Sequence, residues 1–542
     1  MANPSLQIGN DNWAIKEDNL LGYSTAGTRF VPQPITMTRA TLGTRVNPSG
    51  LVEDVALLGS ELVTNGSFTT DSDWDKTGTW SIESNYATAS GNSTSQYIQQ
   101  DFTITNGKTY LFTYEIIENT LNGNGSSLSG SGGFVSVSLS SVIGTHQVYI
   151  TADDSGAAYA LKIGVSGTAT TGTIKLDNVS VKEATINNLP RVDYTDGTSS
   201  LLVEPQRRNL VTYSEVISNL NSLTNGAGTY TITDNYTDSP EGVQNASRVQ
   251  MSIVDTNDTN NYRLINTGSV MTNGVTREIS FYAKSLTGLN QDVLAYWSYD
   301  QQIVTLTNDW QRFEISGTSA NSGAVFIGTR GGSGNYFSGG DANLDFALWG
   351  LQVEDDASGG GSSYATSYIK TSGGTVTRVQ ETYEKSGISD KIGQTEGTFF
   401  IELSKPVLET DGYYLISLNN AASNSDSNSV TIGFDDADDD FYIRLKASGI
   451  NVFLDNLTSS LANTFYKIAV AYKSGQSKIY INGSPINPNQ GSLSNTFTFA
   501  VTLDNLSFDY NGNGTLPFRG NVKQLQIFKT ALSPSELTTL TT

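Results

Sequence analysis

The side chains that could carry acid–base or nucleophilic chemistry are few in this chain. It has one histidine, His146, and no cysteine. The histidine stands in SVIGTHQVYI among alternating apolar residues, a setting that favours a strand-edge side chain over a general base. No G-x-S-x-G sequence marks a serine nucleophile. A site with several histidine ligands, a thiolate metal site and a disulfide are all excluded.

Carboxylates are plentiful, with 53 Asp and Glu against 31 Lys and Arg. A glycosidase needs only two of them, so composition leaves that chemistry open. The densest run, DDADDD at 435–440, falls between two strand-like stretches, where a hairpin turn is expected. Contiguous carboxylates repel one another and stay hydrated, which favours a solvated loop. Because no paired base or nucleophile stands out, we predict that the chain is not an enzyme.

One loop has the spacing of a cation site. DYNGNG matches the first half of a calcium loop, and the residues that present oxygens at alternate positions are Asp509, Asn511 and Asn513. Gly520 stands where the pattern requires a glutamate. Asn-Gly pairs also form plain turns, so a turn without a metal stays open as the alternative.

Sugar binding requires exposed aromatic rings beside polar side chains, because the CH groups of a pyranose stack on ring faces. Two short stretches, DSDWDKTGTW and AYWSYD, supply such rings. The candidates are Trp74, Trp80, Trp297 and Tyr299. Tryptophan and tyrosine also fill the cores of β-sandwiches, so a core position is the alternative for each.

The chain is strongly acidic, with a formal net charge of −22. This charge disfavours binding to nucleic-acid phosphates and to anionic membranes. No stretch is long and apolar enough to cross a bilayer, and the N-terminus lacks the basic and apolar regions of a secretory signal. The lack of cysteine fits assembly in a reducing cytoplasm. We therefore expect no nucleic-acid partner, no membrane insertion and no export by the secretory route.

Strands are the elements expected to position these side chains. Apolar and polar residues alternate in stretches such as GFVSVSLSSV (133–142), IKLDNVSVKE (174–183) and REISFYAKS (277–285), as is typical of half-buried antiparallel strands. Helical periodicity is confined to SPSELTTL (533–540), which begins with a capping serine, a proline and a glutamate in the order of a capping box.

Shifts in composition divide the chain into three β-modules, two connectors and a proline-containing N-terminal segment with little alternation. The predicted segments are an N-terminal arm at 1–58, a first module at 59–184, a connector at 185–208, a second module at 209–356, a connector at 357–395 and a third module at 396–542.

The first connector is more specific than a flexible linker needs to be. RVDYTDGTSSLLVEPQRRNLVTYSE at 191–215 and RVNPSGLVEDVALLGSELVTNGSF at 45–68 share Arg-Val, a turn, Leu-Val-Glu, a spacer and Leu-Val-Thr. A fainter copy is TRVQETYEKSG at 377–387. The repetition predicts a semi-rigid joint, with Arg207 and Arg208 paired to acidic neighbours.

ELVTNGSF, NGKTYLFTYEI and IKLDNVSVKE of the first module resemble the carbohydrate-binding jelly-roll modules attached to many glycoside hydrolases. That family often holds a structural calcium beneath its first and last strands, and the matching carboxylate is Asp177. Thr69 departs from the family, which usually has an acidic residue there. WQRFEISG and LDFALWGLQVED extend the resemblance to the second module, where Trp349 replaces the calcium-binding carboxylate.

EGTFFIEL (396–403), FYKIAVAYKSGQSKIYINGSPI (465–486) and RGNVKQLQIFKTALSPSELTTL (519–540) resemble concanavalin A-like, laminin-G-type sandwiches. Hydrolytic members of that fold carry an E-x-D-x-x-E pattern, which this chain lacks. The predicted fold is all-β: two jelly-roll β-sandwiches followed by a concanavalin A-like β-sandwich, with an extended N-terminal arm.

LLVEPQRRNLVTYSE, LQVEDDASGGGSSYATSYIKTSGGTVTR and the opening NPSLQIGNDNWAIKEDNLLGY look like segments of tailed-bacteriophage tail, collar and fibre proteins. The resemblance implies a structural virion protein, a fibre, collar or capsid-decorating appendage assembled in the cytoplasm of the host bacterium. The N-terminal arm would bind other virion proteins, and the sandwiches would contact host-surface glycan. Such fibres are often trimeric, so a homo-oligomer is implied, with a trimer as the first form to expect.

Two alternatives stay open. The sandwiches could serve a carbohydrate-binding adhesin displayed in another setting. A glycan depolymerase with carboxylates between the modules is the second alternative.

Overall fold

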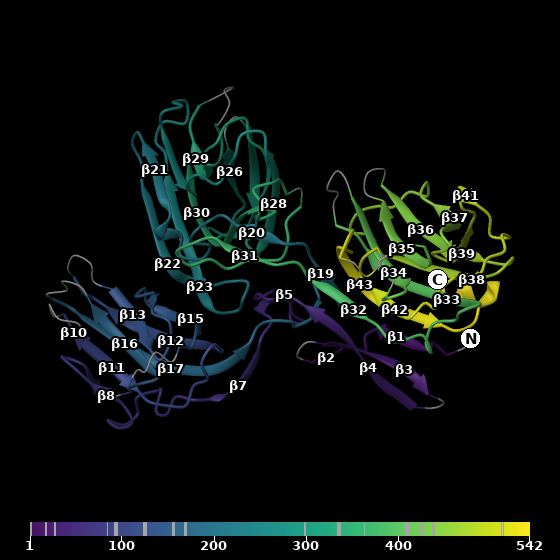
Figure 1. Cartoon of the computed structure of the whole chain (residues 1–542). Coiled ribbons are helices and arrows are strands. Elements are labelled where there is room, and N and C mark those ends of the chain that lie inside the picture. Colours follow the sequence, from purple (N-terminus) through teal and green to yellow (C-terminus); the bar gives the residue numbers. More distant parts are fainter. Residues whose placement is uncertain are drawn as a thin grey trace.

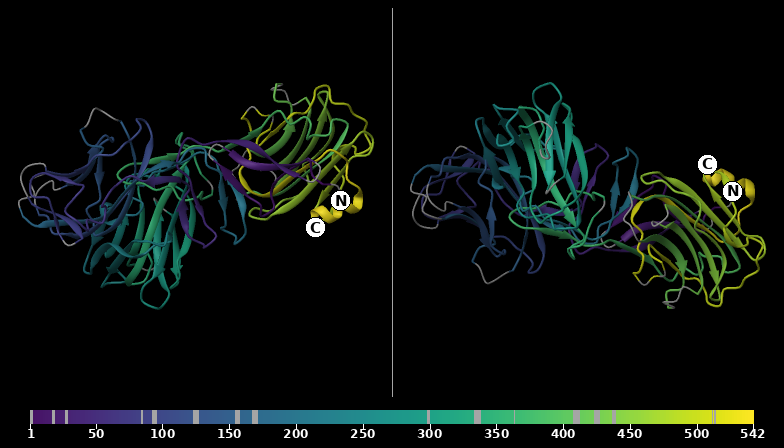
Figure 2. Two further views of the ribbon diagram at one scale, coloured as in Figure 1. Left: turned by 90° about the horizontal axis from the view of Figure 1, so that it is seen from below. Right: turned by 90° about the horizontal axis from the view of Figure 1, so that it is seen from above.

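The fold is given by a computed structural model of the whole chain. The residues that it describes are 3–16, 19–26, 29–83, 85–91, 96–122, 127–153, 158–166, 171–297, 300–332, 338–362, 364–406, 412–422, 427–435, 439–510, 512 and 514–542. Strands form nearly all of the regular structure and stack into three β-bodies (Figure 1), which confirms the predicted all-β class. Two bodies lie together at one end of an elongated molecule, and the C-terminal body lies at the other (Figure 2).

The C-terminal body is a sandwich of two antiparallel sheets. The strands of its first sheet, in order, are β40 (Ser484–Ile486), β39 (Lys478–Ile481), β38 (Tyr466–Lys473), β33 (Glu396–Ser404) and β43 (Gly520–Phe528). Those of its second sheet are β41 (Gln490–Gly491), β37 (Ile450–Asp455), β36 (Asp440–Ala447), β35 (Ser429–Asp435), β34 (Tyr413–Asn419), β42 (Asn505–Ser507) and β32 (Thr382–Lys385). Alternate residues of both sheets meet in one core.

Helix α1 (Pro534–Thr541) follows the last strand of this sandwich. The Ser533 hydroxyl accepts a hydrogen bond from the Glu536 amide, and the Glu536 side chain accepts one from the Ser533 amide. This capping box, with proline at the first helical position, confirms the predicted helix. None of the helices among the described residues has the length and apolar character needed to span a bilayer.

Strands from the start of the chain complete the C-terminal sandwich. They are β1 (Leu6–Gly9), β2 (Ala14–Lys16), β3 (Asn19–Ala26) and β4 (Arg29–Thr38). β1 pairs with β43, β4 pairs with β32, and β3 joins β1 to β4. Buried side chains of these strands belong to the C-terminal core: Leu6, Ile8, Leu20, Ile35 and Met37. The segment predicted as an arm that folds against partners is thus folded against its own chain.

The first sandwich consists of two sheets around one core. The larger sheet contains β15 (Gly144–Thr151), β12 (Thr109–Asn119), β17 (Thr173–Thr185), β10 (Tyr86–Ser90) and β9 (Ser81–Glu83), with β7 (Leu57–Glu61) beside β17. The second sheet is five-stranded and contains β14 (Val137–Leu139), β13 (Ser127–Gly132), β16 (Leu161–Ser166), β11 (Gln96–Gln100) and β8 (Asp75–Lys76).

The second sandwich is built in the same way. Its larger sheet contains β22 (Tyr230–Asp238), β23 (Gln244–Ser252), β30 (Asn343–Asp355), β25 (Thr276–Ser285), β28 (Gln311–Thr318), β20 (Arg207–Asn209) and β31 (Val376–Arg378). Its five-stranded sheet contains β21 (Asn221–Asn225), β24 (Tyr262–Asn266), β29 (Val325–Arg330), β26 (Gln291–Trp297) and β27 (Asp300–Leu306). A short 3-10 helix, η1 (Ile217–Asn219), precedes β21.

The repeated connector motif folds as two hairpins. They are formed by β5 (Thr44–Val46) with β6 (Val52–Asp54), and by β18 (Arg191–Asp193) with β19 (Ser200–Val203). In each, the arginine of Arg-Val binds the glutamate of Leu-Val-Glu at 2.7 Å, Arg45 with Glu53 and Arg191 with Glu204. The shared sequence order therefore encodes a shared hairpin.

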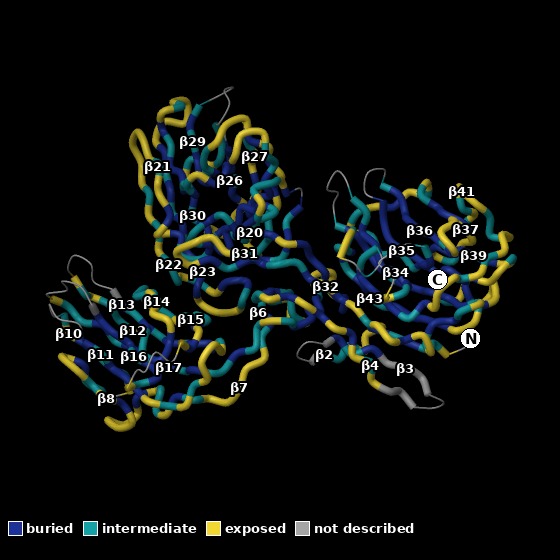
Figure 3. Tube along the Cα trace, in the orientation of Figure 1, coloured by how far each residue is buried: buried dark blue, intermediate teal, exposed yellow. Residues whose placement is uncertain are grey.

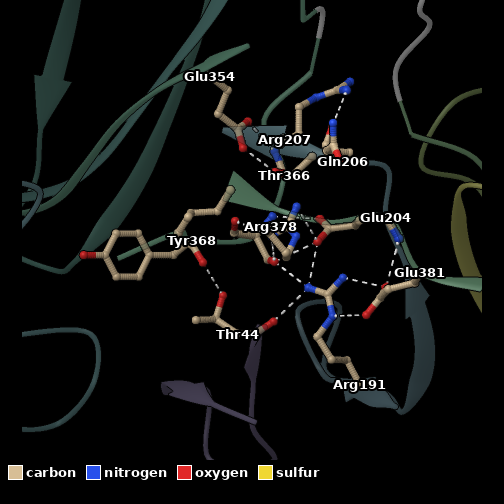
Figure 4. Close-up of polar contacts among 12 residues, drawn as sticks. Thr44, Arg191, Glu204, Gln206, Arg207, Glu354, Thr366, Tyr368, Arg378 and Glu381 are labelled. Carbon is tan, nitrogen blue, oxygen red and sulfur yellow. Dashed lines mark hydrogen bonds and ion pairs between the residues drawn. The ribbon is translucent and has the colours of Figure 1, made fainter. Parts of the chain in front are cut away.

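A cluster of buried charges, the ionic junction, ties the N-terminal segment to both connectors (Figure 4). Its centre is Arg191, which is fully buried and donates to both Glu381 oxygens at 2.7 Å. The same guanidinium donates to Glu204 at 2.7 Å and to the Thr44 carbonyl at 3.0 Å. Arg39 makes a further ion pair with Glu381. Buried charges of this kind hold their geometry because breaking one pair leaves another charge uncompensated.

The electrostatics of the ionic junction favour the charged forms. Burial alone would raise the pKa of Glu204, but Arg378 and Arg191 lower it to about 2. Arg191 and Arg39 likewise outweigh burial and lower the pKa of Glu381. At the neighbouring connector, Arg208 binds Asp355 at 2.5 Å, which confirms the acidic partner predicted for this arginine.

Candidate functional site

The outward face of the five-stranded sheet in the first sandwich carries aromatic and polar side chains. On β16, Leu161, Ile163 and Val165 point into the core, so the residues between them face outward. Lys162 lies opposite Gln99 of β11 and Ser131 of β13, and Gly164 lies opposite Tyr97 and Ser129. With flanking residues, these make up what we name the platform: Asp75, Tyr97, Gln99, Ser129, Ser131, Ser138, Tyr159 and Lys162.

Tyr97 lies flat on the sheet because the facing residue is a glycine. A Cβ atom added to Gly164 would come within 2.7 Å of the Cδ1 and Cε1 atoms of Tyr97 and 3.3 Å of the Ser129 hydroxyl. Glycine thus gives the ring space to lie across β16. The side chain of Tyr97 remains half-buried, which leaves part of the ring accessible.

Lys162 lies between two rings of the platform. Its Nζ atom is 5.8 Å from the ring centre of Tyr97 and 5.7 Å from that of Tyr159. Both distances are within the range of cation–π attraction. Within the described part of the chain, Lys162 has no ion-pair partner.

Tyr159 spans the platform from Lys162 towards Asp75. A hydrogen bond to the Asp75 carboxylate, together with partial burial, raises the pKa of the Tyr159 hydroxyl. Asp75 lies opposite Gln99 on the edge strand β8, two strands from Lys162. Strands are about 4.8 Å apart, so the lysine and the aspartate occupy positions about 10 Å apart on the face. The platform thus presents two rings, a cation, hydroxyls and a carboxylate.

Tyr97, Tyr159 and Lys162 are not among the sugar-binding candidates predicted from the sequence. The alternation in LKIGVS marks Lys162 and Gly164 as outward-facing. Its pairing with SQYIQQ, which brings Tyr97 over the glycine, depends on strand register and cannot be taken from either segment alone.

The two tryptophans predicted to stack sugars in the first sandwich are in its core. Trp74 and Trp80 are each 5% exposed. Trp74 packs 5.2 Å from the ring of Phe68 and donates its indole hydrogen to the Asn65 carbonyl at 3.1 Å. Since a sugar can stack only on an accessible ring face, both residues are corrected to core positions.

Trp297 of the second sandwich is also in a core, at 2% exposure. A Cβ atom on Gly317 would lie only 2.3 Å from its indole ring, which shows how closely the ring packs against β28. Trp297 is therefore corrected to a core position as well. The fourth candidate, Tyr299, lies outside the described residues.

Asp177 lies on β17 opposite Glu115 of β12. Burial and the neighbouring Glu115 raise the pKa of Asp177, and its carboxylate accepts a hydrogen bond from the Asn178 amide at 2.7 Å. The Asn178 side chain donates to Glu115 at 2.6 Å. In the part of the chain that the structure describes, no three acidic, histidine or cysteine side chains converge as metal ligands do. The acidic side chains at this position are Asp177 and Glu115, and a calcium site here stays a prediction.

Asp509 folds its own loop. Its carboxylate accepts hydrogen bonds from the amides of Gly512 and Gly514, the latter at 2.7 Å. These contacts are those of an Asx-type turn. Asn511 and Asn513, the other two candidate ligands, lie outside the described residues.

His146 lies on β15, with its Nε2 atom 2.7 Å from the Val142 carbonyl oxygen. Its ring packs 5.2 Å from that of Tyr114. Burial lowers the pKa of the imidazole.

One part of the chain, near its C-terminus, matches the model of a known family. The model of the concanavalin A-like lectin/glucanases superfamily matches residues 407–538. Residues 407–538 form a concanavalin A-like domain. The match agrees with the two-sheet sandwich described above and covers well under half of the chain, so it assigns this domain alone. No curated protein matches the chain.

Solved structures give remote likenesses. The Ruminococcus gnavus IT-sialidase CBM40 is 16% identical, with a TM-score of 0.24, over 29% of this chain and 98% of that chain. The CBM22-1-CBM22-2 tandem domain of Paenibacillus barcinonensis Xyn10C is 11% identical, with a TM-score of 0.19, over 55% and 98%. Trypanosoma rangeli sialidase in complex with sialic acid is 9% identical, with a TM-score of 0.22, over 96% and 88%.

The prediction that the chain is not an enzyme is wrong as a general statement. Sialidases are among the structures similar to nearly the whole chain, and the exclusion of catalysis is therefore withdrawn. Their TM-scores, 0.22 in each case, are too low to assign a catalytic role to any residue here.

Proposed function

We propose that the protein binds glycans through the platform of the first sandwich. The observation that carries this proposal is the arrangement of Tyr97 and Tyr159, two accessible rings on one sheet face with hydroxyl groups beside them. Ring faces stack on the CH groups of a sugar, while the hydroxyls of Ser129, Ser131 and Ser138, which are at least partly exposed, can hydrogen-bond its hydroxyls. The concanavalin A-like domain and the jelly-roll resemblance of the first module support a glycan as the occupant.

The wider role that we propose is that of a tailed-phage virion appendage of the fibre, collar or capsid-decorating type. It rests on the sequence resemblance of the connectors and the N-terminal segment. In this role the protein is assembled in the cytoplasm of the host bacterium and forms a homo-oligomer on the particle. The ionic junction would hold the sandwiches in fixed positions while one of them contacts host glycan. Contacts with other virion proteins would use the exposed side of β4, at Pro32, Pro34, Thr36 and Thr38.

Replacing one ring tests glycan binding. The Tyr97→Ala variant of the full chain is expected to lose affinity about fivefold or more for any glycan that the native protein binds on an array, since a ring contact contributes about 1 kcal/mol. Tyr86→Ala is the matched control, because Lys175 lies 5.1 Å from the Tyr86 ring on the other sheet of the same sandwich. Equal affinity of the native and Tyr97→Ala proteins, or an equal loss in Tyr86→Ala, would contradict the proposal.

Mass spectrometry of particles purified after lysis of the producing cells tests the virion role. We expect the chain in the particles at stoichiometric levels, and expect a Thr36→Arg/Thr38→Arg variant to remain folded yet be missing from them. Both residues are exposed on β4, so their replacement spares the core. Particles without the native chain would refute the virion role, and normal incorporation of the variant would refute the proposed contact.

A further inference from the structure

Lys162 differs from the other lysine that lies over a ring in the first sandwich. Lys175 lies 5.1 Å from the Tyr86 ring and is neutralised by Glu118, with 2.8 Å between the amine and the carboxylate. Lys162 lies between two rings and has no ion-pair partner among the described residues. Ring quadrupoles attract a cation but do not cancel its charge, so the charge of Lys162 has no counter-ion among the described residues.

We infer that the platform selects acidic saccharides, with Lys162 as the counter-ion of a uronate or sialate carboxylate. This inference rests on the proposed glycan binding and adds the class of sugar. A carboxylate above Lys162 would be close to the cation while the sugar ring stacks on Tyr97 or Tyr159. A neutral sugar could make the same stacking contacts but would leave the cation without a partner.

The orientation of the ligand follows from the charges along one row of the sheet. The row runs Ser131, Lys162, Gln99 and Asp75 across four strands. Asp75 repels a carboxylate and already accepts the hydrogen bond of Tyr159. The acidic group therefore lies on the Ser131 side of Lys162, where hydroxyl groups can donate to its oxygens.

The net charge of −22 does not prevent this recognition. At physiological ionic strength charges are screened over about 8 Å, so the ligand senses Lys162 at contact and little of the distant negative charge. At low ionic strength the whole-molecule repulsion grows and slows the approach of an anionic polymer. The preference for an acidic sugar is therefore expected to be clearest at about 0.15 M salt, the ionic strength at which the screening length is about 8 Å.

A glycan array in which each uronate or sialate glycan is paired with its methyl ester tests the inference on the full chain. The ester keeps the sugar ring and removes the charge. We expect the acid forms to bind about 1.5- to 5-fold more tightly than the esters, the range of an exposed ion pair. Lys162→Met keeps the apolar stem and should bring the acids down to the affinity of the esters, and Lys162→Arg should restore the preference.

A second variant gives the same information without removing the lysine. Ser131→Asp places a carboxylate opposite Lys162 and should abolish the acid preference while Tyr97 still stacks on the sugar. Equal binding of acids and esters by the native protein, or an acid preference that survives in both variants, would overturn the inference and leave glycan binding standing. Binding to no glycan, or affinities indifferent to Tyr97→Ala, would overturn the proposed function with it.

Discussion

The five-stranded sheets of the two sandwiches share a backbone pattern and differ in what they present outward. Each has Ile-Gly at the centre of its middle strand, Ile163-Gly164 in β16 and Ile327-Gly328 in β29. Opposite Gly164 stand Tyr97 and Ser129, whereas Leu264 and Leu294 stand opposite Gly328. Phe326 occupies the place of Lys162 in the second sandwich.

These replacements change an open face into a packed one. Leu264 and Leu294 are fully buried and pack with Tyr262, Tyr296 and Phe326, and the rings of the last two stack at 4.7 Å. The same register thus supports a polar platform in one sandwich and an outer apolar layer in the other. Strand β26 of the second sandwich is buried along nearly its whole length (Figure 3). The alternation within a strand determines which face of the sheet a side chain lies on. Its neighbours on the adjacent strands determine whether the side chain is accessible to solvent.

Each five-stranded sheet is expected to keep its structure without help from the ionic junction. Glu381→Gln is expected to destabilise the junction by about 3–5 kcal/mol, because it leaves Arg191 and Arg39 buried with reduced compensation. Hydrogen exchange should then rise in β18, β19 and β32 and remain unchanged in β16 and β29. Faster exchange in either middle strand would show that the junction also supports that sheet.

Matched truncations on the two outward faces should show which face contributes to stability through packing and which is only exposed to solvent. Leu294→Ala removes a fully buried side chain and should destabilise the second sandwich by about 3 kcal/mol. The corresponding change in the first sandwich, Ser129→Ala, should stay within about 0.5 kcal/mol. Denaturant titration followed by hydrogen exchange in β26 and β13 measures both. Similar losses at the two positions would remove the distinction.

The two central glycines should respond differently to a methyl group. At Gly328, with φ of 153°, an added Cβ would meet the Arg263 carbonyl oxygen at 2.1 Å, so Gly328→Ala should cost about 2 kcal/mol of stability. At Gly164 the obstacle is the Tyr97 ring, a side chain that can tilt. Gly164→Ala should therefore weaken glycan binding and leave thermal stability within about 1 °C of the native value. A large stability loss at Gly164 with unaltered binding would contradict this assignment.

A smaller effect should appear with pH. Burial, followed by the nearby Glu354, raises the pKa of Glu278 in β25 to about 7. The folded state binds this proton more tightly than the unfolded state, so stability present at acidic pH is lost as pH rises from about 4.5 through 7. The second sandwich should be about 1–2 kcal/mol less stable at pH 8 than at pH 5.

Hydrogen exchange in β25 and β28, corrected for the intrinsic rate, measures that difference. Glu278→Gln is the control, since it has no proton to release and should remove the dependence. If the native protein has equal opening free energies at both pH values, titration of Glu278 does not contribute to the stability of the second sandwich.

Local signals predicted much of the fold. Alternation located strands in all three bodies, and the serine, proline and glutamate at 533–536 predicted the only α-helix among the described residues. The repeated Arg-Val and Leu-Val-Glu predicted a repeated joint, and their ion pairs explain the pattern. Each of these features depends on residues close in sequence.

Features that depend on distant residues could not be predicted. β1 pairs with β43, more than 500 positions away, and the sequence alone therefore predicts the N-terminal segment as an arm that folds against partner proteins. Aromatic type alone did not separate the buried Trp74 and Trp80 from the accessible Tyr97, because accessibility depends on which residues face each ring across the sheet. The residues of the platform are brought together by the strand register, and the register is known only from the tertiary fold.

The pairing of β1 with β43 has a consequence for synthesis on the ribosome. About 510 residues separate the two strands, which at 5–20 residues per second amounts to roughly 25–100 s of translation. Until β43 emerges from the ribosome, Leu6 and Ile8 cannot pack into the core of the C-terminal sandwich, where they are buried in the folded protein. The first and second sandwiches can form in that interval, because their strands are local. Formation of the C-terminal body is therefore the last event, and it closes the polypeptide into a loop whose two ends share one sheet.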